Sequence, residues 1–225
     1  MIPSDNTGHL PVFGDSGADP NSNLTFFREW LRNPFGTAAV APSGRQLAAL
    51  MVAQLPHGAR RVIELGGGTG AITRALLHHG IRPDGLLVIE LNEALHQYLH
   101  ERFPRAHVLR ADARDMREVA QCCGLLEERG TVDAVISGLG MLSMPREAQR
   151  EILRAAFSVL PAAGGFVQFT YGPRSPVSRE LLEELHLKVR RGGTAWRNVP
   201  PANVFVYQRR RSRQINSKHR VEGCK

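Results

Sequence analysis

A glutamate and three glycines stand at alternating positions in the stretch ELGGGTG, which covers residues 64–70. Glycine lets the backbone turn sharply and approach a ligand closely, so Gly66, Gly68 and Gly70 predict a turn that holds a small molecule. The dinucleotide pattern GxGxxG seats a pyrophosphate at a helix end, whereas this pattern begins with an acid, Glu64. A carboxylate in that place suits a ligand that carries an ammonium group and no phosphate.

Further polar side chains end the next three apolar stretches. The stretch GLLVIE ends at Glu90, twenty residues after Gly70, where a carboxylate can accept hydrogen bonds from both hydroxyls of a ribose. The next stretch runs to Asp112 and Ala113, which are placed to contact an adenine, and the stretch TVDAVIS ends at Ser137. In a doubly wound sheet these strand ends and the glycine turn line one crevice, so the ligand predicted there contains an adenosine.

These groups require strands and helices that alternate along the chain. Four apolar stretches read as parallel strands, GGFVQFTY reads as a fifth, and NVFVY reads as the last. The predicted fold is a doubly wound, Rossmann-like α/β sheet with an N-terminal amphipathic helical extension. From residue 60 to about residue 170 the pattern resembles that of the class I methyltransferases, which implies S-adenosylmethionine (AdoMet) as the cofactor.

Length and charge limit the alternatives. At 225 residues and 42% hydrophobic, the chain suffices for one α/β domain with an appendage. Residues 209–225 hold seven Lys or Arg against one Glu, so this tail carries +6 of the net +8 and the rest only +2. That balance argues against nucleic acid as a partner; the basic tail is either solvated or attracted to anionic lipid. No apolar run reaches about 18 residues, and no signal peptide is evident, which predicts a cytoplasmic protein.

The three cysteines show no zinc-binding spacing, and the pair His96 and His100 lacks a third ligand, so no metal is expected.

The segment TFFREWLRNP, before the glycine turn, is both apolar and basic. On a helical wheel over residues 24–35, Phe26, Phe27 and Trp30 share one half with the other apolar residues, while the arginines share the opposite half. Two interpretations remain open, a helix that covers the domain core and a helix that lies in a lipid interface. The predicted organisation is a flexible leader (1–23), this helical lid or membrane-binding segment (24–59), the methyltransferase domain (60–208) and the basic tail (209–225).

Several stretches between residues 24 and 208, among them FFREWLRNPFGTAAVAPSGRQLA, DAVISGLGML, VQFTYGP and NVPPANVFVY, together resemble the bacterial phospholipid N-methyltransferases. The resemblance implies a peripheral enzyme at the inner face of the cell membrane that methylates phosphatidylethanolamine stepwise to phosphatidylcholine. It also implies a distant relation to the rRNA adenine dimethylases. Gly140 stands where the family usually has proline, so a related amino lipid such as ornithine lipid is an alternative substrate.

The acceptor side of the predicted crevice supplies the remaining candidates. Tyr171, after the fifth strand, can accept a hydrogen bond from the amine and hold methylated cations against its ring. Ser137 and the backbone carbonyl of Leu139 are further acceptors, and Arg174 and Arg197 match the geometry of a lipid phosphate. Two rivals are an RNA or protein methyltransferase and a membrane-binding module that binds AdoMet without turnover.

Overall fold

The computed structural model of the chain describes residues 42–210, apart from residues 128 and 199. The predicted leader, the amphipathic segment 24–35 and residues 211–225 of the basic tail lie outside the described residues.

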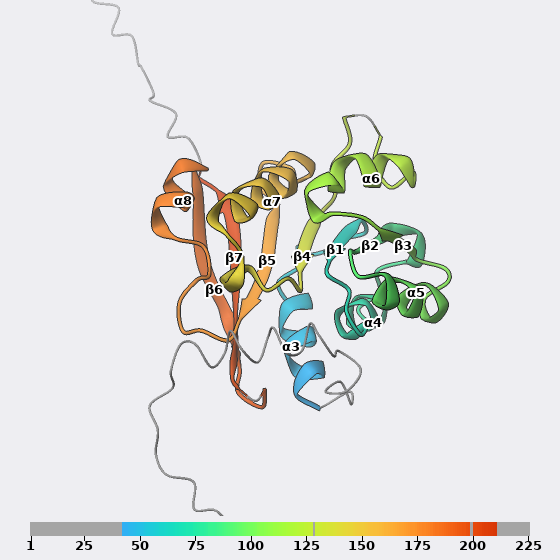
Figure 1. The fold of residues 1–225 in the computed structure, drawn as a ribbon, viewed down its shortest axis with the longest axis horizontal. Helices are drawn as coiled ribbons and strands as arrows, with labels where there is room; N and C mark the ends of the chain where they lie inside the picture. The colour runs from blue at the N-terminus through green and yellow to red at the C-terminus, as the bar shows by residue number, and fades with distance from the viewer. Residues whose placement is uncertain (1–41, 128, 199, 211–225) are drawn as a thin grey trace, which may run out of the picture.

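Seven strands of the described region form one sheet in the order β3-β2-β1-β4-β5-β7-β6 (Figure 1). Neighbouring strands from β3 to β5 are parallel, whereas β7 is antiparallel to both β5 and β6. The strands span Val62–Leu65 (β1), Leu86–Glu90 (β2), His107–Arg110 (β3), Ala134–Ser137 (β4), Gly165–Thr170 (β5), Leu187–Ala195 (β6) and Ala202–Arg209 (β7). The reversal of strand order between β1 and β4 confirms the predicted doubly wound sheet.

Helices cover both faces of this sheet (Figure 1). Helices α6 (Met116–Cys122), α7 (Arg146–Val159) and α8 (Arg179–Glu184) enclose one hydrophobic core. Helices α3 (Pro42–Val52), α4 (Ala71–His78) and α5 (Glu93–Arg102) enclose the other. Three short 3₁₀ turns connect the elements, at Pro83–Gly85 (η1), Ala113–Asp115 (η2) and Met141–Ser143 (η3). Because both faces are covered, β1, β2 and β4 are buried along their full length, which explains their continuous apolar sequences.

Two features add to the predicted domain. Helix α3 buries Leu47, Met51 and their neighbours against the sheet, beside α4 and β6. The edge strand β6 did not figure in the sequence prediction, because Lys188 to Arg191 are exposed in succession and show no apolar alternation. Charged residues on an edge strand are a common protection against pairing with another chain.

Candidate functional site

The glycine turn connects β1 to α4 at the carboxyl edge of the sheet. Gly66 and Gly70 have φ angles of 71° and 77°, in the left-handed region that favours glycine. A Cβ at Gly66 would lie 2.8 Å from Leu139 Cδ2, and one at Gly70 would lie 2.5 Å from Phe103 Cε2. The turn is therefore packed so closely that side chains at these positions would displace the loops around it.

Glu64 lies on β1 below this turn and is fully buried. Its Oε2 accepts a hydrogen bond of 2.7 Å from the hydroxyl of Thr73, in the first turn of α4. Its Oε1 is buried with no partner among the described residues. Burial raises the pKa of this carboxyl to about 8, and the negative charge of Glu90 adds to the shift. The ligand-free side chain is therefore mostly protonated at neutral pH and holds a polar atom that a cationic group would satisfy.

Glu90, the last residue of β2, lies against the glycine turn. Its Oε2 accepts from the backbone N–H of Gly68 at 3.0 Å, and its Oε1 accepts from the N–H of Asn92 at 2.9 Å. A carboxylate offers about four acceptor positions, so two remain for the hydroxyls of a ribose. The structure thus brings Glu64, Glu90 and the glycine turn together at one place.

Asp112 lies two residues beyond β3, where it begins η2. Its Oδ1 accepts from the N and Nε of Arg114, both at 2.9 Å, and its Oδ2 accepts from Nη2 at 2.7 Å. The Arg114 guanidinium lowers the pKa of this carboxyl and also contacts Glu151 of α7 at 3.0 Å. Asp112 is therefore already engaged by Arg114, and an adenine amino group would share it; Ala113 follows as the first residue of η2.

The end of β4 and the loop after it hold two of the predicted catalytic residues. Ser137 is buried, and its hydroxyl accepts from the N–H of Leu139 at 3.3 Å. The carbonyl of Leu139 accepts from Gln168 Nε2 at 2.8 Å and from the N–H of Met141 at 2.9 Å. Both lone pairs of this carbonyl are thus occupied. The carbonyl could accept a hydrogen bond from an amine only if one of these two hydrogen bonds were broken. Gln168, which the sequence prediction did not include, anchors the loop from within β5.

Gly140, at the position where proline was expected, has φ −76° and ψ 60°. The hydrogen bond from the Met141 N–H to the Leu139 carbonyl makes it the centre of an inverse γ-turn. Proline fixes φ near −65°, so its ring would fit this backbone. The loop therefore has the same backbone conformation at Gly140 that a proline would impose there.

Gly140→Pro is expected to stabilise the protein by about 0.4 to 1 kcal/mol, because it removes conformational freedom from the unfolded chain. Urea denaturation of the variant and the parent measures this difference. Gly138→Pro is the matched control, since the Gly138 N–H donates to the Leu65 carbonyl at 2.7 Å and proline would lose that bond. A Gly140→Pro variant as unstable as the control would contradict the assigned turn.

Tyr171 follows β5 on the face covered by α3 and packs edge-on against Phe169, with 5.5 Å between ring centroids. Burial raises the pKa of its hydroxyl, and a hydrogen bond with the Asn198 side chain opposes that shift. Asn198 is buried in the turn between β6 and β7, and its amide also donates to the Pro200 carbonyl at 3.1 Å. Asn198 thus fixes the hairpin turn to the predicted catalytic tyrosine, a contact that the sequence prediction did not include.

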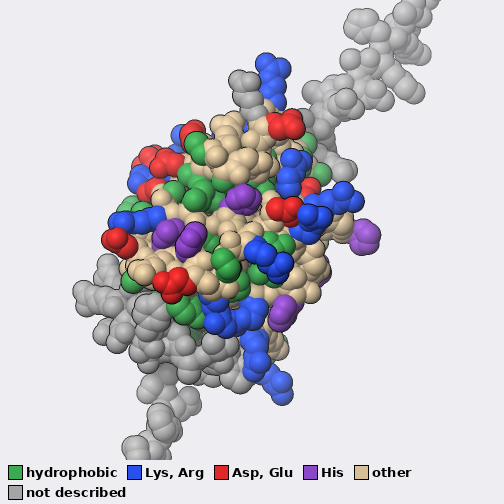
Figure 2. Space-filling view, turned by 90° about the vertical axis from the view of Figure 1, so that its right-hand side faces the viewer, with side chains coloured by type: hydrophobic (Ala, Val, Ile, Leu, Met, Phe, Trp, Pro, Cys, Tyr) green, Lys and Arg blue, Asp and Glu red, His purple; other side chains and the backbone are tan. Residues whose placement is uncertain are grey.

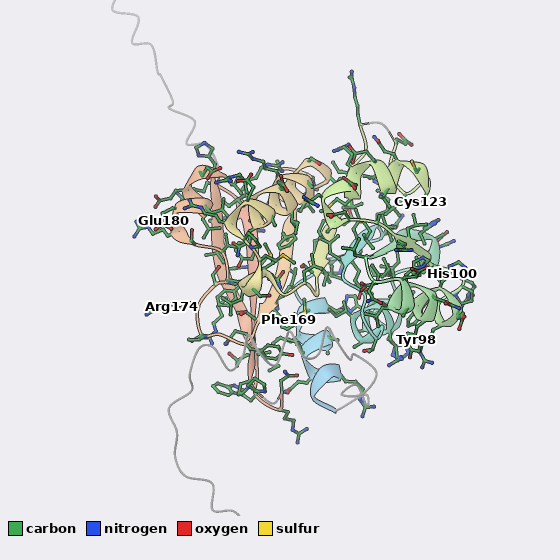
Figure 3. The ribbon with its side chains drawn as sticks, viewed as in Figure 1. Tyr98, His100, Cys123, Phe169, Arg174 and Glu180 are labelled. Atoms are coloured by element: carbon green, nitrogen blue, oxygen red, sulfur yellow. The ribbon has the colours of Figure 1, made fainter. Side chains whose placement is uncertain are left out.

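The predicted substrate-binding arginines lie on two different loops. Arg174 is exposed on the loop after β5 and points away from the body of the protein, whereas Phe169 lies within it (Figure 3). Arg197 is exposed in the β6–β7 turn, and its N–H donates to Gln46 Oε1 of α3 at 3.0 Å. Arg197 directly precedes Asn198, which contacts Tyr171. Phe26, Phe27 and Trp30 lie outside the described residues.

Leu91, directly after Glu90, is 63% exposed, which is unusual for a large apolar side chain beside a buried strand. It stands at the carboxyl edge next to the predicted ribose-binding acid, where it is available to cover an adenine ring. In the sequence, Leu91 could have been identified as a candidate by its position immediately after Glu90, the acid that ends β2.

The described residues also bear on metal binding and on membrane spans. In residues 42–210, as far as they are described, no three His, Cys, Asp or Glu side chains cluster so as to hold a metal ion. The rings of His96 and His100 stack with 6.0 Å between centroids. None of the described helices has the length and apolar character needed to span a bilayer.

The chain is similar to known methyltransferases in sequence. A family profile described as "Methyltransferase domain" matches residues 62–164. An ornithine lipid N-methyltransferase of Singulisphaera acidiphila is 32% identical over 187 residues, which cover 80% of this chain and 92% of that protein.

Solved structures share the fold at lower identity. A TehB-like SAM-dependent methyltransferase from Corynebacterium glutamicum has a TM-score of 0.53 at 18% identity and covers 85% of this chain and 100% of its own. The 1,6-didemethyltoxoflavin-N1-methyltransferase of Burkholderia thailandensis, solved with its substrate and S-adenosylhomocysteine, has a TM-score of 0.55 at 15% identity, covering 89% of this chain and 94% of its own. Likeness at this level concerns the fold alone.

Proposed function

Because the chain belongs to the class I AdoMet-dependent methyltransferases, we propose that it transfers methyl groups to the amine of a membrane amino lipid. The observation that carries the proposal is the 32% identity to an ornithine lipid N-methyltransferase over 187 residues. That match is far longer than the 62–164 stretch of the general methyltransferase profile. It therefore takes in segments outside the cofactor-binding part of the chain.

Among amino lipids we place ornithine lipid first, because that relative acts on it. Phosphatidylethanolamine and its methylated intermediates come second, on the resemblance of the late motifs to the phospholipid N-methyltransferases. Both headgroups present an amine close to an anionic group, a carboxylate in one and a phosphate in the other. The exposed guanidinium groups of Arg174 and Arg197 match either anion.

The residues at the glycine turn fit AdoMet. When bound, AdoMet supplies a methyl group on a positively charged sulfur. The backbone of the turn has positive φ angles at Gly66, Gly68 and Gly70, which lets it bend sharply and approach a ligand closely. Glu90 keeps acceptor positions for ribose hydroxyls, and the unpartnered Oε1 of Glu64 is suited to the ammonium group. Asp112 shares its carboxylate between Arg114 and the adenine amino group.

The acceptor amine must be neutral when it attacks, and a lipid ammonium titrates well above pH 7. Burial beside a positive charge lowers the pKa of such an amine and favours loss of the proton. The hydroxyl of Tyr171, held by Asn198, accepts a hydrogen bond from the amine and orients its lone pair. The rings of Tyr171 and Phe169 then hold the methylated cations of later rounds, with about 0.5 to 2 kcal/mol for each cation–π contact.

The test of the proposed function is transfer of labelled methyl from AdoMet to lipid dispersed in neutral detergent micelles. Separate reactions contain ornithine lipid, phosphatidylethanolamine, or its mono- and dimethyl forms, with rRNA as a further acceptor. We expect label in ornithine lipid at the highest kcat/KM. Label only in the phosphatidylethanolamine series would reverse the order of substrates, and label in RNA or in no lipid would reject lipid methylation.

Tyr171→Phe is expected to lower kcat/KM for the lipid about 10- to 100-fold, because it removes the hydroxyl and keeps the ring. Tyr207→Phe is the matched control. Its hydroxyl is 2.7 Å from the Ser175 hydroxyl, and it belongs to the hydrophobic core on the opposite face of the sheet from Tyr171. Equal activities of the two variants would show that the Tyr171 hydroxyl does not contact the amine.

A further inference from the structure

Trp196 stands at the tip of the β6–β7 hairpin and is 74% exposed, more than any other large apolar side chain in the described part of the chain. An exposed indole leaves a large apolar area in water, so a solvent-facing tryptophan indicates a binding surface. Tryptophan combines an apolar ring with a polar N–H, which suits the boundary between lipid headgroups and acyl chains.

The surroundings of Trp196 carry charge of one sign. The hairpin, residues 187–210, contains six Lys or Arg and no Asp or Glu, although Lys188, Arg209 and Arg210 lie at the end remote from Trp196. Helix α3, which packs beside β6, adds Arg45 and no acid. Arg45, Arg190 and Arg197 are all exposed. The side of the molecule at the right of Figure 1 differs, because acidic and basic side chains are mixed on it (Figure 2).

The exposed basic surface formed by the β6–β7 hairpin tip and α3, called the basic face below, lies beside the proposed acceptor site. The start of β7 pairs with the end of β5, Asn203 opposite Thr170, so the hairpin tip reaches beyond the carboxyl edge of the sheet (Figure 1). Asn198, two residues after Trp196, contacts Tyr171. The hairpin is also tied to the turn that follows α3, because Gln54 of that turn donates to the Gly192 carbonyl at 3.2 Å and accepts from Arg190 at 2.9 Å.

We infer that this face, formed by the β6–β7 hairpin tip and α3, docks on the surface of an anionic bilayer. Trp196 enters the headgroup region, and Arg45 and Arg197 contact lipid anions. The surface potential of anionic lipid attracts such residues, and the mixed charges on the side shown in Figure 2 offer no comparable attraction. The inference rests on the proposed function, since an enzyme that methylates a membrane lipid must reach the membrane surface. Tyr171 then lies beside the lipid surface from which a headgroup is taken.

Fluorescence tests the docking directly. The chain has two tryptophans, so Trp30→Phe in the full-length protein leaves Trp196 as the only one. We expect its emission to shift to shorter wavelength with vesicles of phosphatidylcholine and phosphatidylglycerol, and to be quenched by a lipid-attached quencher. Pure phosphatidylcholine vesicles and high salt should suppress the shift, because the attraction is electrostatic.

Three results would overturn the docking. Emission already at short wavelength in buffer would mean that another segment or a second copy of the chain covers the indole. No response to anionic vesicles would exclude insertion. A response to an RNA oligonucleotide in place of vesicles would assign the basic face to nucleic acid.

Vesicle sedimentation gives the size of the effect. Trp196→Ser should weaken binding to anionic vesicles about tenfold, and Arg45→Gln about fivefold, near the contribution expected for one basic residue at such a surface. Val189→Ser and Arg105→Gln are the controls, since Val189 is exposed on β6 away from the tip and Arg105 is exposed at the opposite edge of the sheet, before β3. Unchanged binding by Trp196→Ser would contradict the inference.

Methylation in neutral detergent micelles separates this inference from the proposed function. Trp196→Ser should keep the wild-type kcat there and lose activity only on vesicles. If the wild-type protein methylates no amino lipid in micelles, the proposed function fails, while the fluorescence result still decides the docking.

Discussion

Glu64→Gln is expected to stabilise the ligand-free protein at pH 8 and, at the same time, to weaken its affinity for AdoMet. The carboxyl is fully buried, its Oε1 has no partner among the described residues, and its pKa is raised to about 8. Glutamine keeps the size of the side chain and an acceptor for Thr73, but it cannot ionise. The two effects have opposite signs because the buried negative charge destabilises the empty site and attracts the ammonium group of the cofactor.

The sign of the pH dependence follows from proton linkage. The pKa of Glu64 is about 8 in the folded protein against 4.5 in the unfolded chain, so between these values the folded state binds the extra proton. The stability contributed by this protonated carboxyl is fully present below pH 4.5 and is lost as the pH rises through 8. The shift corresponds to a stability difference on the order of 5 kcal/mol.

Denaturation in urea from pH 5 to pH 9 should therefore show stability that falls with pH in the wild type and falls less in Glu64→Gln. Glu93→Gln is the control, because Glu93 is exposed and pairs with Arg110 on the surface. Calorimetry at pH 7 in buffers of different ionisation enthalpy adds a second measurement: AdoMet should release close to one proton from the wild type and none from Glu64→Gln. Parallel pH profiles and equal proton release would remove Glu64 from the cofactor site.

Glu90→Ala is expected to weaken AdoMet binding at least about a hundredfold, since hydrogen bonds to a charged group contribute about 1.5 to 3 kcal/mol each. The variant also leaves the N–H groups of Gly68 and Asn92 without their acceptor, which loosens the glycine turn. Glu90→Gln, which keeps one acceptor oxygen, should lose less affinity. Isothermal titration with AdoMet measures all three proteins.

A ligand lacking one ribose hydroxyl distinguishes direct contact from loosening of the turn. If Glu90 binds the ribose, Glu90→Ala and loss of the hydroxyl should not be additive, because both remove the same hydrogen bond. Glu93→Ala, three residues further on the exposed surface of α5, should leave affinity unchanged. Additive losses would assign Glu90 to support of the turn alone.

The strands that carry the site were predictable because parallel strands covered on both faces are short, continuous apolar stretches. Glu90 and Ser137 end β2 and β4 as expected, whereas Asp112 lies two residues beyond β3. Strand β6 was missed because its exposed Lys188 to Arg191 hide the pattern. The fold class and the cofactor thus followed from the order of apolar stretches and glycines.

The amino-acid sequence was sufficient for groups that lie within one strand and the turn after it, such as Glu64 and the glycines, because backbone geometry places them at a constant separation. It was insufficient for contacts between distant segments. Gln168 holds the loop at Leu139, Arg114 reaches Glu151, and the hairpin turn at Asn198 meets Tyr171. These contacts depend on how the helices and the antiparallel strands pack on the sheet. Packing brings together residues that are far apart in the sequence, and no pattern of nearby residues predicts such contacts. It also leaves Trp196 exposed beside them.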